Sequence, residues 1–229
     1  MVRANRIRIA VAALLALCGA PAAAQLPATW DDLVSVKPKV LTAVYLLPGA
    51  DFRPYRKVRI ANVRTAFHKD WQTNVNRGVT TNRKITSADA ERMANEFRAS
   101  AGTVFADAFK AGGYEIVTEP AADVLELDVQ ILNLYVNAPV RPGGKTESIA
   151  VDAGEASLVL EARDSTTQAV LGRALDRRRT RPNDIGMPAT EASNRDDFAL
   201  LFKGWATQAV KGLEELKANS PVKVQAPGK

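Results

Sequence analysis

The chain has 229 residues, 46% of them hydrophobic, and a formal net charge of +6. This length is enough to bury one self-sufficient core, and a single cysteine, Cys18, excludes a disulfide framework. The only histidine is His68, which leaves no ligand set for a zinc or haem site. We therefore expect one globular domain with no metal and no other cofactor.

Residues 1–24 have the layout of a secretory signal peptide. Three arginines precede the apolar stretch Ile9–Ala20, which is shorter than the roughly twenty residues of a membrane-spanning helix. Ala22-Ala23-Ala24 then form a small-residue cleavage site before Gln25. Removing the leader lowers the net charge from +6 to +3, a mild value that does not favour nucleic acid as a partner.

Cys18 raises the alternative of an outer-membrane lipoprotein. Lipidation requires a small residue just before the cysteine, but here Leu17 is bulky. Cleavage after Ala24 would also discard Cys18. The sequence therefore favours a soluble periplasmic product, and the mature chain has no later stretch apolar enough to span a membrane.

The mature chain is predicted to contain one domain between two polar ends. Residues 25–39 are interrupted by proline and predict a flexible lead-in, residues 40–218 the domain, and residues 219–229 a disordered tail. A short apolar run opens the domain and ends at the turn signal Pro48-Gly49. The stretch "KVRIANVRTAF" predicts a strand, and residues 68–86 predict a long loop.

A helix is predicted next. Thr86 or Ser87 can cap its start, and Asp89 lies in the first turn, where a carboxylate is favourable. Apolar residues recur at steps of three and four, and Gly112-Gly113 provide a stop signal. The predicted helix is therefore amphipathic and can cover a sheet.

Strands dominate the following part. After "YEIV", the stretch "DVLELDVQILNLYVN" alternates apolar and polar residues, and the parity changes at Ile131-Leu132, which predicts a bulge or bend. The stretch "ASLVLEARDSTTQAVLGRAL" predicts a hairpin with its turn around Asp164 to Gln168. Ser193 is predicted to cap a final helix with Trp205 on its apolar stripe.

The order of elements is strand, helix, three or four strands, helix. This order predicts an α+β fold, a two-layer sandwich in which a mainly antiparallel sheet of four to five strands packs against two amphipathic helices.

Three stretches carry a resemblance to a known family: "YLLPGADFRPYRKVRIANVRTAFHKDW", "AADVLELDVQILNLYVNAP" and "AGEASLVLEARDSTTQAVLGRALDRR". On these the chain resembles the bacterial domain-of-unknown-function 3313 family, from about Tyr45 to Leu216. The resemblance implies an exported protein or lipoprotein, and it implies no catalytic residues. The element order is also similar to that of small α+β modules in envelope assembly proteins, which is a fold-level analogy only.

No motif indicates an enzyme, and we predict no catalytic residue. Asp152 and Glu155 could act as paired carboxylates in a hydrolase of the cell wall or of lipid, which we keep as the alternative. His68 beside Asp70 is more typical of a surface pair than of a dyad. Trp71 and Tyr55 lie in irregular stretches, where they could form an exposed contact or anchor a loop.

The stretch "RALDRRRTR" is the strongest candidate for contact with a partner. Arg173, Arg177 and Arg179 should share one strand face, spaced about 6–7 Å apart, and arginine forks suit phosphates and carboxylates. The competing interpretation is a solvated strand end, which we favour, with Arg178 opposite Glu155 and Arg181 near Asp152.

The predicted function is that of an exported, non-enzymatic protein that binds another envelope component, either a protein or an anionic lipid or glycan. A soluble carrier for a small anion is a third possibility, and it would require a concave pocket.

Overall fold

The computed structural model describes residues 27–140, 148–149, 152–182 and 188–223. The elements follow one another as β1 (Thr29–Trp30), β2 (Leu33–Val36), β3 (Ala43–Leu46), β4 (Lys57–Phe67), α1 (Trp71–Val75), η1 (Thr81–Arg83), α2 (Ser87–Ala111), β5 (Glu115–Ile116), β6 (Val124–Val136), β7 (Ser148–Ile149), β8 (Gly154–Asp164), β9 (Val170–Arg179), β10 (Pro188–Ala189) and α3 (Glu191–Ala218).

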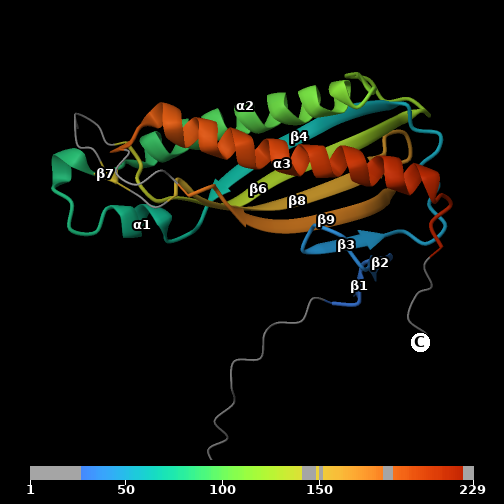
Figure 1. The fold of residues 1–229 in the computed structure, drawn as a ribbon, viewed down its shortest axis with the longest axis horizontal. Helices are drawn as coiled ribbons and strands as arrows, with labels where there is room; N and C mark the ends of the chain where they lie inside the picture. Colours follow the sequence, from blue (N-terminus) through green and yellow to red (C-terminus); the bar gives the residue numbers. More distant parts are fainter. Residues whose placement is uncertain (1–26, 141–147, 150–151, 183–187, 224–229) are drawn as a thin grey trace, which may run out of the picture.

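The main sheet has eight strands in the order β1-β2-β3-β9-β8-β6-β4-β5, so the α+β class is confirmed but the predicted number of strands is wrong (Figure 1). The sheet is mixed, because β4 runs parallel to both β5 and β6. The long connection through α2 makes the parallel pair possible. β1 and β5 have two residues each, too few to give a periodic signal, and β7 and β10 form a separate pair.

Both long helices lie on one face of the sheet (Figure 1). A Cβ atom added at Gly102 of α2 would lie 3.6 Å from Val63 of β4, so the helix packs closely on this strand. Trp205 of α3 donates a hydrogen bond to Asp176 of β9. Trp205 is fully buried, as predicted. Among the residues described, no helix has both the length and the apolarity needed to cross a membrane.

Each long helix begins with a capping box, in which two backbone donors at the helix start are satisfied reciprocally. Thr86 caps α2 with Asp89, as the sequence predicts. The cap of α3 is Thr190, with Ser193 at the third helical position, so the assignment of Ser193 as the cap is wrong. Both residues are small hydroxyl residues, which explains why composition alone places the helix start three residues late.

The predicted irregularity in β6 lies two residues later than expected. Asn133 adopts a positive φ of 51°, and the register with β8 shifts between Leu132 and Tyr135. From Leu127 to Ile131 the buried positions of β6 are odd, and from Leu134 to Val136 they are even. One extra residue thus changes which positions of β6 face the core, from odd to even, and the strand continues.

Described residues of both predicted end segments contact the domain. β1 and β2 lie in the lead-in 25–39, and Leu33 is buried against Ala43 and Tyr45 of β3. At the other end, Val222 is buried and exchanges backbone hydrogen bonds with Gly49 and Ala50. These contacts join residues distant in sequence, so local composition does not reveal them.

The predicted loop 68–86 contains α1 and the single turn η1. Trp71 of α1 is fully buried, stacks on Phe67 with ring centroids 3.9 Å apart, and donates its indole N–H to the Val136 carbonyl. Tyr55 is also buried and donates to Asp164 at 2.8 Å. Both aromatic side chains therefore anchor their loops and do not form an exposed contact, so the loop-anchor interpretation is confirmed.

Candidate binding surface on the uncovered sheet face

The register of the β8–β9 hairpin decides where its arginines lie. Arg179 is opposite Glu155 and Arg178 is opposite Ala156, one residue away from the predicted pairing of Arg178 with Glu155. An irregularity between Ala162 and Arg163, close to the turn, causes the shift. Because side chains alternate between faces, this one residue moves Glu155 to the same face as Arg179.

Arg173, Arg177 and Arg179 share the sheet face that points away from α2 and α3. The intervening residues face the helices: Asp176 accepts from Trp205, and Arg178 lies beside Gly204. The alternation of one strand thus separates the basic stretch into two groups. The predicted shared face is present, but its three arginines have different surroundings.

Arg173 is held inside a network of the protein's own groups. Its guanidinium pairs with Glu161 and Asp31, each at 2.5 Å, and lies 4.5 Å from the centre of the Trp30 ring. Only 12% of its side chain is exposed. Burial lowers the pKa of Arg173, but the bonds to Asp31 and Glu161 outweigh it and leave the pKa above its usual value. Arg173 therefore stabilises the fold and is not open to a partner.

Arg177 and Arg179 remain on the surface, with 67% and 73% of their side chains exposed. Both pair with the same carboxylate, Glu155, at 2.5 Å and 3.4 Å. Two cations on one anion leave an excess of one positive charge. Pairing between β3 and β9 ends at Leu175, so neither arginine lies beside β3.

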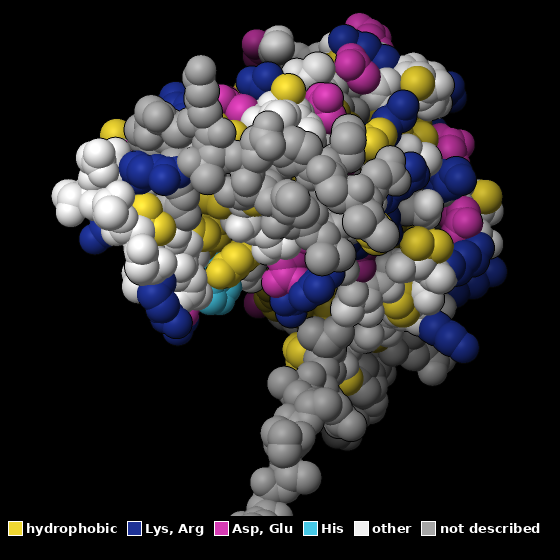
Figure 2. Space-filling model, turned by 60° about the vertical axis from the view of Figure 1, so that its left-hand side comes forward, with side chains coloured by type: hydrophobic (Ala, Val, Ile, Leu, Met, Phe, Trp, Pro, Cys, Tyr) yellow, Lys and Arg dark blue, Asp and Glu magenta, His cyan; other side chains and the backbone are white. Residues whose placement is uncertain are grey.

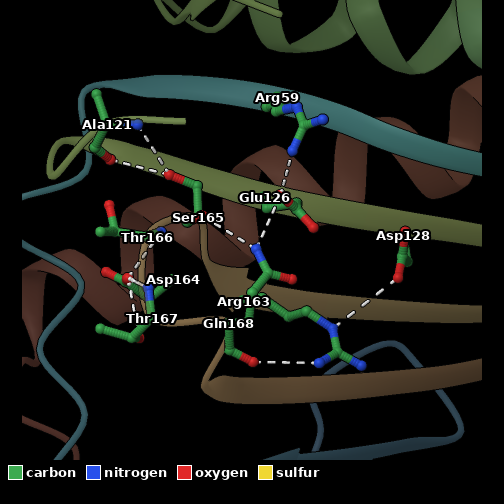
Figure 3. A network of polar contacts seen from close by, with 10 residues as sticks. All are labelled: Arg59, Ala121, Glu126, Asp128, Arg163, Asp164, Ser165, Thr166, Thr167 and Gln168. Carbon is green, nitrogen blue, oxygen red and sulfur yellow. Dashed lines mark hydrogen bonds and ion pairs between the residues drawn. The ribbon is translucent and has the colours of Figure 1, made fainter. Parts of the chain in front are cut away.

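The rest of this face carries polar ladders across the central strands (Figure 3). Arg59 of β4 pairs with Glu126 of β6 at 2.6 Å, and Gln168 also donates to Glu126. Arg163 of β8 lies 3.9 Å from Asp128 and also pairs with Glu161. Neighbouring long side chains cover these acids, so Glu126 and Glu161 are buried although no helix of the described part of the chain lies over them.

Asp164 holds the turn of the hairpin at the edge of this network (Figure 3). Its carboxylate accepts from the backbone N–H of Thr166 and Thr167 at 3.0 and 2.7 Å and from the Tyr55 hydroxyl. Partial burial raises the pKa of Asp164, but these bonds outweigh it and keep the pKa below its usual value. The predicted turn around Asp164 to Gln168 is confirmed.

The residues of the hydrolase alternative are engaged in other contacts. Glu155 is shared by two arginines, and Asp152 is buried and accepts from the Asn137 amide at 2.6 Å. His68 lies 3.9 Å from Asp70, with both side chains on the surface. In the part of the chain that the structure describes, no three His, Cys, Asp or Glu residues are grouped closely enough to hold a metal ion.

Charge is mixed over the side of the molecule that Figure 2 shows. Basic and acidic side chains lie next to one another, and hydrophobic side chains occur between them. No large area of one sign is visible there. The sequence predicted Arg173, Arg177 and Arg179 as one group, but not the partners Asp31 and Glu161 that set Arg173 apart.

Comparison with known proteins gives a family and a set of distant structures. A family model described as "Protein of unknown function (DUF3313)" matches residues 33–209. No curated protein matches the chain. The PelC dodecamer from Paraburkholderia phytofirmans is similar at 14% identity, covering 74% of this chain and 95% of that chain, with a TM-score of 0.39.

Two further solved structures are similar at the same level. Protein XCC0632 from Xanthomonas campestris, of family DUF330, has 14% identity over 76% of this chain and 91% of its own, with a TM-score of 0.35. A neuraminyllactose-binding hemagglutinin homologue from Helicobacter pylori has 10% identity over 76% and 92%, with a TM-score of 0.36. At these TM-scores the likenesses carry no functional argument.

Proposed function

The chain belongs to the DUF3313 family of proteins of unknown function, and from that premise we propose that it is an exported envelope protein that acts by binding rather than by catalysis. The proposed contact is the pair Arg177 and Arg179, and the proposed partner is an anionic surface of the envelope. Export rests on the signal-like residues 1–24 and on the cleavage pattern before Gln25.

The observation that carries the proposal is the difference in exposure along β9. Arg173 is 12% exposed and satisfied by two carboxylates, whereas Arg177 and Arg179 are 67% and 73% exposed and share one. Two guanidinium groups on alternate residues of a strand lie about 7 Å apart. Such a pair can engage two anionic oxygens of a lipid or glycan surface at once.

The hydrolase alternative has little support from the described residues. Glu155 and Asp152 already accept hydrogen bonds or ion pairs from other side chains of the protein. A general acid or base must instead reach a substrate proton.

The test is binding to vesicles with and without phosphatidylglycerol, measured by co-sedimentation at increasing salt. Each arginine near an anionic membrane contributes about 1 kcal/mol, so Arg177→Gln with Arg179→Gln should weaken binding about thirtyfold. Wild-type binding should fall as salt shortens the Debye length below about 10 Å.

Arg64→Gln is the matched control, because Arg64 is an exposed arginine of β4 on the same sheet face. Replacing Arg177 and Arg179 by lysine gives a second control, because it keeps both positive charges and removes the guanidinium groups. If Arg64→Gln weakens binding as much per charge, or if the double glutamine variant binds like wild type, then the two arginines are a solvated strand end and not a site.

A further inference from the structure

A cavity lies between α3 and the sheet, on the face opposite the arginines. Its inner part has a volume of about 110 Å³ and reaches Leu125 and Phe109 in the core. An outer hollow of about 450 Å³ lies between the second half of α3 and residues 36–41. The two parts adjoin, and we call them together the channel; the residues that line both are Leu41, Val44, Leu46, Gln208, Gly212 and Leu216.

Small side chains on both walls create this channel. The sheet contributes Ala162, Gly172 and Ala174, and α3 contributes Ala209 and Gly212. A Cβ atom added at Gly212 would meet no atom within 4 Å. Ala162 and Ala174 point to the helix side of the sheet and still remain partly exposed, because α3 does not fill the space above them.

The chemistry changes from the inside of the channel to its mouth. The inner lining is aliphatic and aromatic apart from Gln208 and Arg173, and the latter's guanidinium is bound on the other face. The mouth carries Lys37, Lys39 and Lys211, all exposed, and one acid, Glu215, which pairs with Lys39 at 3.0 Å. The described residues of the mouth therefore carry a net charge of +2.

We propose that this channel binds the chain of a free fatty acid, with its carboxylate at the lysines of the mouth. An apolar interior that ends in an excess of ammonium groups matches one hydrocarbon chain that ends in one anion. Among the residues that the structure describes, the lining of the mouth contains lysines but no arginine. It therefore offers point charges rather than the fork that binds a phosphate in two places. This site uses none of the residues of the proposed arginine contact, and it makes the protein a carrier for an amphiphile.

The test is isothermal titration calorimetry of the full-length protein with octanoate, decanoate and dodecanoate, each below its micelle concentration. One-to-one binding should tighten by about fourfold for each added methylene that the channel buries. Lysophosphatidylglycerol of equal chain length forms the second arm and should bind more weakly. No saturable binding of dodecanoate, or tighter binding of the lysophospholipid, would overturn the proposal.

Gly212→Leu should fill the channel and reduce dodecanoate affinity at least tenfold. The variant should stay folded, because leucine is a better helix former than glycine. Gly212→Ala, which adds one methyl group, is the matched control and should retain most of the affinity. Unchanged affinity in Gly212→Leu would place the fatty acid elsewhere and refute the site.

The lysines can be tested separately. Replacing Lys37, Lys39 and Lys211 by glutamine should weaken dodecanoate but leave dodecanol unaffected, whereas Lys203→Gln, on the same helix but outside this lining, should change neither. Equal loss for the acid and the alcohol would show that the lysines do not bind the carboxylate.

Discussion

The two faces of the main sheet are stabilised in different ways. The face under α2 and α3 is apolar, and Asp176, a buried acid on that side, is hydrogen-bonded by Thr42, Arg178 and Trp205. The uncovered face carries Glu126 and Glu161, which are also buried, but neighbouring arginines cover them. The comparison shows that alternate residues of the same strands can hide acids either under a helix or under the stems of basic side chains.

The covered face should be the more sensitive to substitution. Trp205→Ala removes a fully buried ring and leaves the Asp176 carboxylate with one donor fewer, so the free energy of unfolding should fall by about 3–5 kcal/mol. Urea denaturation measures the loss. Trp205→Phe keeps most of the volume and removes the N–H, so it should lose about 1–3 kcal/mol. A loss below 1 kcal/mol for alanine would mean that α3 contributes little to the core.

Arg173 should behave as a buried member of the uncovered face. Arg173→Met keeps an aliphatic side chain but removes the guanidinium from the Trp30 ring, leaves Glu161 with Arg163 as its remaining cation, and frees Asp31. We expect the free energy of unfolding to fall by about 2 kcal/mol in thermal or urea denaturation. Arg179→Met is the control on the same strand. Equal effects for the two variants would contradict the separation of Arg173 from the exposed pair.

Asp164, at the turn of the β8–β9 hairpin, makes stability depend on pH. Its pKa lies below the usual value of about 3.9, so its contribution to stability is present above pH 4 and is lost as pH falls through the lowered pKa. Asp164→Asn should destabilise the protein by about 1 kcal/mol at pH 7. The difference from wild type should shrink between pH 4 and pH 2 in urea denaturation, and a difference that stays constant would refute this role.

The smallest effect on stability is expected at Arg177 and Arg179. Their side chains are mostly exposed, so each change to glutamine should alter the free energy of unfolding by less than about 0.5 kcal/mol. A larger loss in denaturation experiments would mean that Glu155 depends on them, and it would remove the reason to assign them to a partner.

Features with a local signal could be predicted from the sequence, whereas contacts between distant segments could not. Periodicity placed Trp205 in the core, and a change of parity indicated the irregularity near Asn133. Arg173 finds Asp31 from the other end of the domain, a contact that spacing along β9 cannot reveal. The one-residue error in the hairpin came from an irregularity beside the turn, where Gly172 pairs with Ala162 and Leu171 has no partner in the register. A glycine inside a strand is a signal for such an irregularity, and the sequence prediction did not use it.

The apolar channel could not be predicted from the sequence for a related reason. Ala162, Ala174 and Ala209 have the right polarity for a core, so pattern alone treats their positions as filled. Only the distance between α3 and the sheet decides whether small residues pack closely or leave a space.

The pairing of β3 with β9 has a consequence for the time course of folding. Val44 and Ala174 are direct partners although most of the chain lies between them, and Val222 closes on Gly49 and Ala50 later still. A chain that emerges from its amino end holds the short strands β1 to β3 without their main partner until β9 is available, and so few residues are marginal alone. Closure of this pair is a long-range step, which slows folding. We expect completion of the sheet to await β9, so a chain interrupted before β9 would expose an unpaired edge.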